Sequence, residues 1–197
     1  MPDELLVAVL AAGASRRLGR PKQLVELGGE PLVRRVCRTA IAAGIGPVAD
    51  VLGCRRDEIA SVVSDLQVKV LDNDAWDGGM ASSVRTAALA ALEQKVVALL
   101  LLHADQYAVS GDDLVRLRDA WRASSQSACL SRDGEHLGPP AILPARLFDR
   151  MRTLAGDTGP RAILRGDPRV REVPMPSASR DVDCPADLVA ANERNLP

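Results

Sequence analysis

The chain has 197 residues, of which 25 are basic and 26 acidic, so its formal net charge is −1. A chain of this length suits a single domain, residues 1–197, that buries about 70% of its unfolded surface without disulfides. Balanced charge gives no global field for nucleic acid or a membrane, and 2% aromatic residues leave almost no stacking platform for single strands. Any site for anions must therefore be local.

The cysteines lie far apart and include no C-x-x-C pair, which predicts reduced thiols rather than a metal or redox centre. They are Cys37, Cys54, Cys129 and Cys184. Asp3 and Glu4 precede the first apolar run, unlike a basic targeting region, and no apolar stretch reaches the roughly 18 residues of a membrane span. We expect a cytoplasmic protein with no membrane or nucleic-acid partner.

Six largely apolar residues, 5–10, predict a buried strand, which small residues at 11–13 then end. Behind them come four cations, Arg16, Arg17, Arg20 and Lys22, on a segment broken by Gly19. Such a loop suits polyphosphate, because backbone amides and cations supply compensating charge. Its glycine spacing matches neither a P-loop nor a dinucleotide fingerprint. The alternative is a solvated basic turn.

The next stretch alternates helix and strand patterns. A helix is expected at 32–43 after Pro31, strands at 48–52 and 68–71, and between them a helix at 57–65 capped by Asp57. These alternations describe β-α-β units. They predict a mainly parallel sheet with helices on both faces.

Residues 73–83 are rich in polar and small side chains and should form a loop that enters a helix at 82–92. Gly79, Ser82 and Ser83 would place free amides and hydroxyls of a helix N-terminus near a ligand. The alternative is an ordinary capped helix on which Trp76 is a packing plug.

Residues 96–102 are the most hydrophobic run and predict the central strand, which Asp105 follows closely. Open α/β sheets bind ligands at the carboxyl ends of their strands, so Asp105 is the natural Mg²⁺ ligand. Its alternative is a turn residue.

The rest of the chain predicts a helix at 112–123 and strands at 128–131 and 170–173. Residues 136–143 contain two prolines and cannot be a regular central strand throughout. Residues 144–154 and 160–164 look helical, and Pro185 begins a last helix.

Residues 10–22, LAAGASRRLGRPK, closely resemble the signature L-A-A-G-x-S-x-R-M-G-x-x-K of nucleotidyltransferases related to the molybdenum cofactor guanylyl- and cytidylyltransferases. Leu18 replaces the methionine. Residues 73–83 are similar to N-x-x-W-x-x-G-x-x-x-S of the cytidylyltransferases, and Asp105 with Gln106 to D-Q-P, with Tyr107 in place of proline. The resemblance implies an α/β fold in three layers, with a mainly parallel Rossmann-like sheet of the nucleotidyltransferase type.

The resemblance also implies residue roles. The catalytic residues would be Lys22, which neutralises charge on the transferred phosphorus, Arg17, which holds the leaving phosphates, and Asp105. Nucleotide binding would involve Leu10, Ala11, Ala12, Gly13, Ser15, Arg17, Lys22, Gly79, Ser82 and Ser83. Asp105 and Asp183 would bind the metal, and Gly138, Asp157 and Arg161 the acceptor.

The implied reaction transfers CMP from CTP to the terminal phosphate of molybdopterin, with Mg²⁺ as cofactor and pyrophosphate as the second product. A client molybdoenzyme or its chaperone would be the protein partner. Guanylyl transfer and transfer to another small phosphate are open alternatives, because nothing in the sequence alone reads the base. A non-catalytic nucleotide-binding or cofactor-binding module is a further alternative from a different class.

Overall fold

The computed structural model describes residues 5–182 and 185–195, and within these ranges seven strands form one sheet in the order β5-β4-β1-β6-β8-β7-β9. The strands are β1 (Leu5–Leu10), β4 (Val48–Leu52), β5 (Val68–Asp72), β6 (Ala98–His103), β7 (Ala128–Asp133), β8 (His136–Pro144) and β9 (Val170–Pro174). β5, β4, β1 and β6 run parallel, whereas β8 is antiparallel to β6 and β7, and β9 is parallel to β7. The expected mainly parallel sheet is confirmed, with β6 at its centre.

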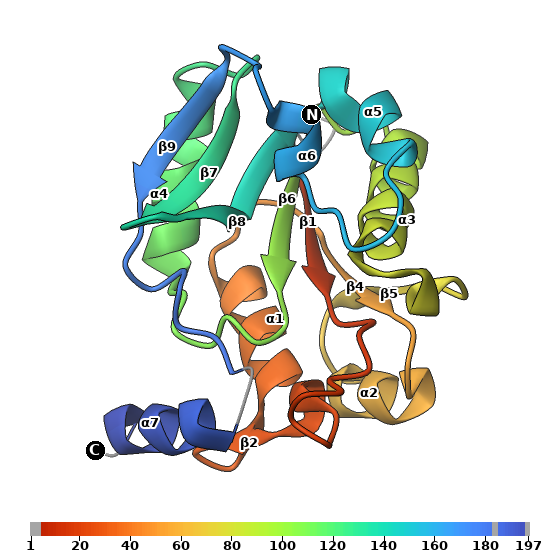
Figure 1. The fold of residues 1–197 in the computed structure, drawn as a ribbon, viewed down its shortest axis with the longest axis vertical. Coiled ribbons are helices and arrows are strands. Elements are labelled where there is room, and N and C mark those ends of the chain that lie inside the picture. Colours follow the sequence, from red (N-terminus) through yellow and green to blue (C-terminus); the bar gives the residue numbers. More distant parts are fainter. Residues whose placement is uncertain (1–4, 183–184, 196–197) are drawn as a thin grey trace.

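Helices cover both faces of the sheet, which makes three layers (Figure 1). One face packs on α1 (Leu32–Ala42), α2 (Arg56–Val63) and α4 (Gly111–Arg122), the other on α3 (Met80–Glu93), α5 (Phe148–Arg152) and α6 (Arg161–Leu164). Strand β1 explains how one sequence serves both faces. Its odd residues, such as Val7, join the first core and its even residues, such as Ala8, the second, because side chains alternate along a strand.

A small third core lies beyond the edge of the sheet. The hairpin of β2 (Glu26–Leu27) and β3 (Glu30–Pro31) packs there against α7 (Pro185–Asn195), as the lower part of Figure 1 shows. Leu18 of the cationic loop and Tyr107 pack against this cluster. The outer end of the loop is therefore anchored by apolar contacts. The short 3-10 segments are η1 (Lys22–Leu24), η2 (Trp76–Gly78) and η3 (Ala145–Leu147).

Some element boundaries differ from the sequence predictions. Asp57 was predicted to cap α2, but the N-cap is Arg55 in a left-handed conformation, φ 56°, and Asp57 lies in the first helical turn. Helix α3 starts at Met80 rather than at residue 82. The predicted helix at 144–154 is reduced to η3 and α5.

Strand β8 shows how a proline pair enters an interior strand. Ala141 pairs with both Leu101 of β6 and Leu130 of β7, yet the register on β7 shifts between Leu130 and Ser131. The shift falls opposite Pro139 and Pro140, which have no N–H for the ladder. The prediction that this segment is not regular throughout is confirmed.

Strand β4 carries a buried acid, Asp50, whose side chain lies 4.0 Å from the Sγ of Cys37. Burial raises the pKa of Asp50 to about 8. Burial also raises the pKa of the Cys37 thiol, and the nearby Asp50 adds to that effect. Cys37, Cys54 and Cys129 are free thiols, and none of the helices in residues 5–182 and 185–195 is long and apolar enough to cross a membrane.

Candidate active site

Strands β1 and β6 place two predicted segments at one edge of the sheet. They run parallel with Leu10 opposite His103, so the loop after β1 and Asp105 both leave from the same carboxyl edge. A pocket of about 370 Å³ lies there. Parts of the loop 10–23, the turn 76–80, residues 103–105 and Asp157 line it. This is the position where open α/β sheets bind ligands.

The pocket brings together many of the residues expected to bind nucleotide, metal or acceptor. Those that line it are Leu10, Ala12, Gly13, Lys22, Gly79, Ser83, Asp105 and Asp157. Those that do not are Ala11, Ser15, Arg17, Ser82, Gly138 and Arg161. Asp183, expected to be a second metal ligand, lies outside the described residues. Arg16 lines the pocket where its neighbour Arg17 was expected.

An ion pair marks the chemical centre of the pocket. The Nζ of Lys22 contacts the Oδ2 of Asp105, whose side chain is 3% exposed against 26% for Lys22. A buried carboxylate is costly unless a cation compensates it. The pair therefore places a positive and a negative group side by side in the pocket.

Gln23 holds the cationic loop from within, a role that the sequence analysis missed. Its Nε2 donates hydrogen bonds of 2.7 Å to the carbonyl oxygens of both Ala11 and Gly13, and its side chain is buried. The hydroxyl of Ser15 donates to its Oε1 at 3.2 Å and accepts from the backbone N–H of Lys22 at 3.0 Å. Ser15, expected at the nucleotide, thus closes the loop on itself. A glutamine directly after Lys22 was the available signal.

Trp76 lines the pocket beside the start of the loop. Its side chain lies against Gly53, where an added Cβ would come within 2.4 Å of the Cβ of Trp76 and 3.0 Å of that of Ala12. Only glycine permits this approach. Trp76 was read as either a packing plug or part of a ligand segment. It packs on Gly53 and also lines the pocket, so its part in ligand binding stays a prediction.

Asn73 fixes the two serine hydroxyls of helix α3. Its buried Nδ2 donates to the Oγ of Ser82 at 2.8 Å and to the Oγ of Ser83 at 3.1 Å. The hydroxyl of Ser82 donates a hydrogen bond to the carbonyl oxygen of Gly79 at 2.8 Å, so its proton is already used within the protein. Ser83 lines the pocket and accepts from Asn73, so its hydroxyl proton can be donated to a ligand.

The N-terminus of α3 is less open than the sequence predicted. The backbone N–H of Ala81 donates to the carbonyl of Gly156 at 3.0 Å, and that of Met80 to the Oδ1 of Asp157 at 3.4 Å. The segment around Asp157 therefore takes up two of the helix's first amides. Asp157, expected on the acceptor side, lines the pocket beside the N-terminus of α3.

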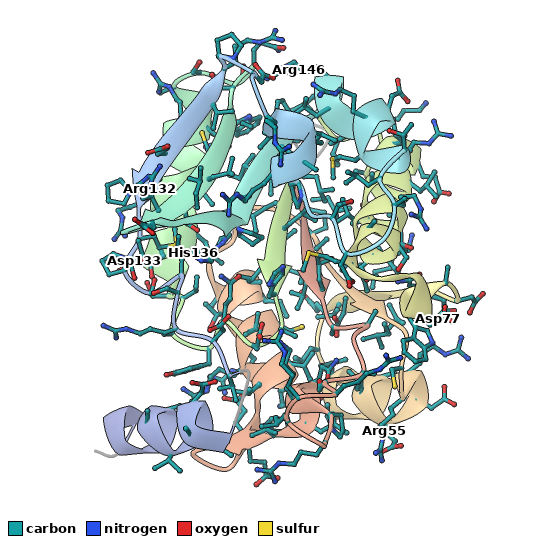
Figure 2. All side chains as sticks on the ribbon, in the orientation of Figure 1. Arg55, Asp77, Arg132, Asp133, His136 and Arg146 are labelled. Atoms are coloured by element: carbon teal, nitrogen blue, oxygen red, sulfur yellow. The ribbon has the colours of Figure 1, made fainter. Side chains whose placement is uncertain are left out.

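The remaining acceptor candidates lie elsewhere. Gly138 is buried in β8, and its carbonyl accepts from the Oγ of Ser131 at 2.9 Å. Figure 2 shows His136 near the end of this hairpin, well separated from Asp77 beside α3. Gln106, the residue after Asp105, connects the end of β6 to β8. Its Nε2 donates to the carbonyl oxygen of Pro139 at 2.7 Å and to that of Ala178 at 2.9 Å.

The donor set fits a divalent cation held mainly by substrate. Within residues 5–182 and 185–195, no three His, Cys, Asp or Glu side chains gather closely enough to cage a metal. Asp105 offers one buried carboxylate in the pocket. One or two carboxylates completed by phosphate oxygens and water are the usual environment of Mg²⁺.

A mainly parallel three-layer sheet with a cationic loop after β1 and a carboxylate after β6 defines an α/β protein of the nucleotidyltransferase type. The comparison with protein families agrees, because the family described as "MobA-like NTP transferase domain" matches residues 7–173. The chain belongs to this family and is a MobA-like nucleotidyltransferase.

Individual relatives show the same likeness. The chain is 32% identical over 195 residues to "Molybdenum cofactor guanylyltransferase" of Pseudomonas putida, covering 93% of each. It is 37% identical over 113 residues to "Bifunctional IPC transferase and DIPP synthase" of Rubrobacter xylanophilus, covering 51% of this chain but only 26% of that protein. Among solved structures, the Rv0371c homolog from Mycobacterium sp. strain JC1 has a TM-score of 0.83 at 25% identity, covering 98% of this chain and 100% of that one.

Proposed function

We propose that the protein transfers CMP from CTP to the terminal phosphate of molybdopterin and releases pyrophosphate, with Mg²⁺ as cofactor. The observation that carries this proposal is the contact of Lys22 with Asp105 at the end of the cationic loop. Two charged groups of opposite sign are what a metal-bound triphosphate needs from a protein.

The reaction is a substitution at the α-phosphorus of the nucleotide. An oxygen of the acceptor phosphate forms the new bond, the bond to the oxygen bridging the α- and β-phosphates breaks, and pyrophosphate leaves. The acceptor phosphate is already ionised, so the protein needs no general base. Its contribution is to place the groups and to compensate their charge.

Lys22 and Asp105 divide that work. The Lys22 ammonium turns from the carboxylate to the transferred phosphoryl group, and Asp105 then holds the cation. Asp105 would be a protein ligand of Mg²⁺, which would supply positive charge to offset that of the phosphates. Arg16 on the pocket wall or Arg17 beside it holds the leaving phosphates, and Asp183 is proposed as a second metal carboxylate.

The pocket wall carries two kinds of group that suit a nucleotide. Arg16 and Lys22 supply positive charge for the phosphates, and Trp76 and Ser83 supply an aromatic face and a hydroxyl for the base. The hydroxyl of Ser83 can donate, because it accepts from Asn73. Cytosine offers acceptors at O2 and N3, and guanine offers O6 beside its N1–H and N2–H donors, so a donor hydroxyl can bind either base. The choice of CTP therefore rests on the resemblance of residues 73–83 to the cytidylyltransferase pattern.

Guanylyl transfer is the second candidate. It is favoured by the likeness to "Molybdenum cofactor guanylyltransferase" of Pseudomonas putida, which extends over 93% of both chains. A hydrogen bond left unmade in a formed pocket costs about 1 to 3 kcal/mol, so the preferred base should win by roughly tenfold to a hundredfold.

The test assays radiolabelled CTP and GTP separately with molybdenum-loaded pterin, empty pterin and a sugar 1-phosphate. We expect turnover with CTP and the pterins alone. A clear preference for GTP moves the protein to the guanylyl reaction, and rapid transfer to the sugar phosphate discards the pterin acceptor. Nucleotide binding without turnover on any acceptor supports a non-catalytic module.

We also propose that residues 1–197 act as one nucleotidyltransferase domain in the cytoplasm, where free thiols such as Cys37 and Cys54 persist. The product would be passed to a client molybdoenzyme or its chaperone. Co-purification of the tagged chain with a molybdoenzyme from cells supplied with molybdate would support this step, and its loss without molybdate would show that the loaded cofactor is needed.

A further inference from the structure

We propose that Gln23 is the positioning residue of the triphosphate site: its buried side-chain amide turns the loop carbonyls inward, so that the loop amides face the ligand. The inference rests on the proposed function, since it concerns the loop assigned to the triphosphate. Gln23 does not supply the charge itself. It acts through the backbone of residues 11–15 and through Lys22.

The carbonyl oxygens at the end of β1 are all engaged by the protein. Those of Ala11 and Gly13 accept from Gln23, that of Ala12 accepts from the backbone N–H of Cys54 at 3.0 Å, and that of Leu10 from Ala104 at 3.2 Å. The two bonds from Gln23 are the shortest of the four. The negative ends of these peptides are therefore turned toward protein donors.

The direction of the carbonyls sets that of the amides. Among the described peptides only the one between Pro139 and Pro140 is cis, so the peptides of this loop are trans. In a trans peptide the C=O and the N–H point in opposite directions. The N–H groups of Ala12 and Ala14, which belong to the peptides whose carbonyls bind Gln23, thus point away from Gln23. Both residues line the pocket, as does Gln23, so the two alanines and the Gln23 side chain border one cavity.

We call the hydrogen bonds of the Gln23 side chain to Ala11, Gly13 and Ser15 the clasp, and the loop needs it most at Gly13. A Cβ added at Gly13 would meet nothing within 4 Å, so no packing restrains the backbone there. Ala11 and Ala12 carry no polar side chain. Fixing one residue's backbone costs about 1 to 2 kcal/mol, and without Gln23 a ligand would have to meet that cost on binding.

The clasp also reaches the catalytic cation. The hydroxyl of Ser15 donates to the Oε1 of Gln23 and accepts from the backbone N–H of Lys22. The start of the loop therefore bonds to the Gln23 side chain directly, and Lys22 is connected to that side chain through Ser15. Lys22 then presents its ammonium to Asp105 from a fixed backbone. One buried glutamine thus sets the loop amides and the lysine together.

The test compares Gln23→Met, which keeps the length but removes the donors, with wild type. Isothermal titration measures binding of inorganic pyrophosphate, CTP and GTP with Mg²⁺. We expect binding of each ligand that wild type binds to weaken about tenfold or more and by the same factor, because loop and not base contacts are lost. Hydrogen exchange of amides 12–16 should accelerate in the ligand-free variant.

A control separates positioning from stability. Trp121→Phe removes a buried donor of the same kind, because its Nε1 donates to the carbonyl of Ser125 at 3.0 Å, far from the pocket on α4. It should lower the melting temperature but leave the three affinities unchanged. Ser15→Ala, which removes only the outer bond of the clasp, should weaken binding about threefold and serves if Gln23→Met does not fold.

The outcomes are distinct. Wild-type affinity for pyrophosphate in Gln23→Met, or in Ser15→Ala if that variant replaces it, overturns the inference while the proposed function stands. Equal weakening by Trp121→Phe also overturns it, since general destabilisation would then explain the loss. If wild type binds none of the three probes, the proposed function itself fails.

Discussion

The ammonium of Lys22 contacts the carboxylate of Asp105, although the two residues lie 83 positions apart in the chain. Lys22 begins η1 after the loop that leaves β1, and Asp105 follows β6, the parallel neighbour of β1. Asp105 is almost fully buried, and the Lys22 ammonium beside it supplies compensating positive charge. Both residues therefore allow direct tests of the site.

Asp105→Asn should abolish most metal-dependent turnover and leave the fold intact. The amide keeps the shape of the carboxylate but is a poor ligand for a hard cation, and pyrophosphate release should fall by about two orders of magnitude or more. The measurement is pyrophosphate release over a Mg²⁺ titration. Asp112→Asn, in the exposed first turn of α4, is the control and should behave as wild type. Equal turnover at limiting Mg²⁺ would remove Asp105 from the metal site.

Lys22→Ala should lower kcat more than it raises KM for the nucleotide, because its charge acts on the transferred phosphorus. The arginine that holds the leaving phosphates should change both constants. Comparing Arg16→Ala with Arg17→Ala decides between them, since Arg16 lines the pocket whereas the resemblance assigns this role to Arg17. Steady-state kinetics with varied nucleotide measures the split, and an unchanged kcat in Lys22→Ala would contradict its role.

Gly79→Ala should destabilise the fold by about 2 kcal/mol or more. Gly79 has φ 92° and ψ −179°, a conformation that only glycine adopts readily, and an added Cβ would come within 2.6 Å of the Gly156 carbonyl. Gly78→Ala is the matched control, because a Cβ there meets nothing within 4 Å, and it should stay within about 1 kcal/mol of wild type. Urea denaturation measures both. Similar losses would contradict the special role of Gly79.

Asp50 should make the protein less stable as pH rises. Burial raises its pKa from an ordinary 3.8 to about 8, so between these values the folded state holds one proton more than the unfolded state. The stabilisation from this extra proton is fully present below the pKa of the unfolded state. As pH rises from that pKa to the pKa of the folded state, the free energy of unfolding falls by at most about 1.4 kcal/mol per pH unit. Asp50→Asn has no such proton, and its stability should fall less steeply. Parallel curves from urea denaturation at pH 5 to 8 would refute this.

Much of the fold followed from local sequence signals. The strand patterns at 5–10, 48–52 and 170–173 and the helix at 32–43 depend on apolar spacing, and the structure confirms them. The start of α3 was harder to predict from the sequence. The backbone N–H of Ala81 donates to the carbonyl oxygen of Gly156, and no local pattern relates these two segments. Asp57 was misassigned as a cap because the backbone turn at Arg55 replaced a side-chain cap.

The sequence by itself determined the α/β class, the cationic loop and the carboxylate after the central strand, because each depends on residues that are neighbours in the chain. Only the tertiary structure decided which of those groups share one pocket. It put Lys22 on Asp105, Asn73 on Ser83 and Gln23 beneath Gly13, and it put Gly138 and Arg161 outside the pocket. The reason is that strand order and register bring distant segments together, and no local pattern in one sequence encodes strand order.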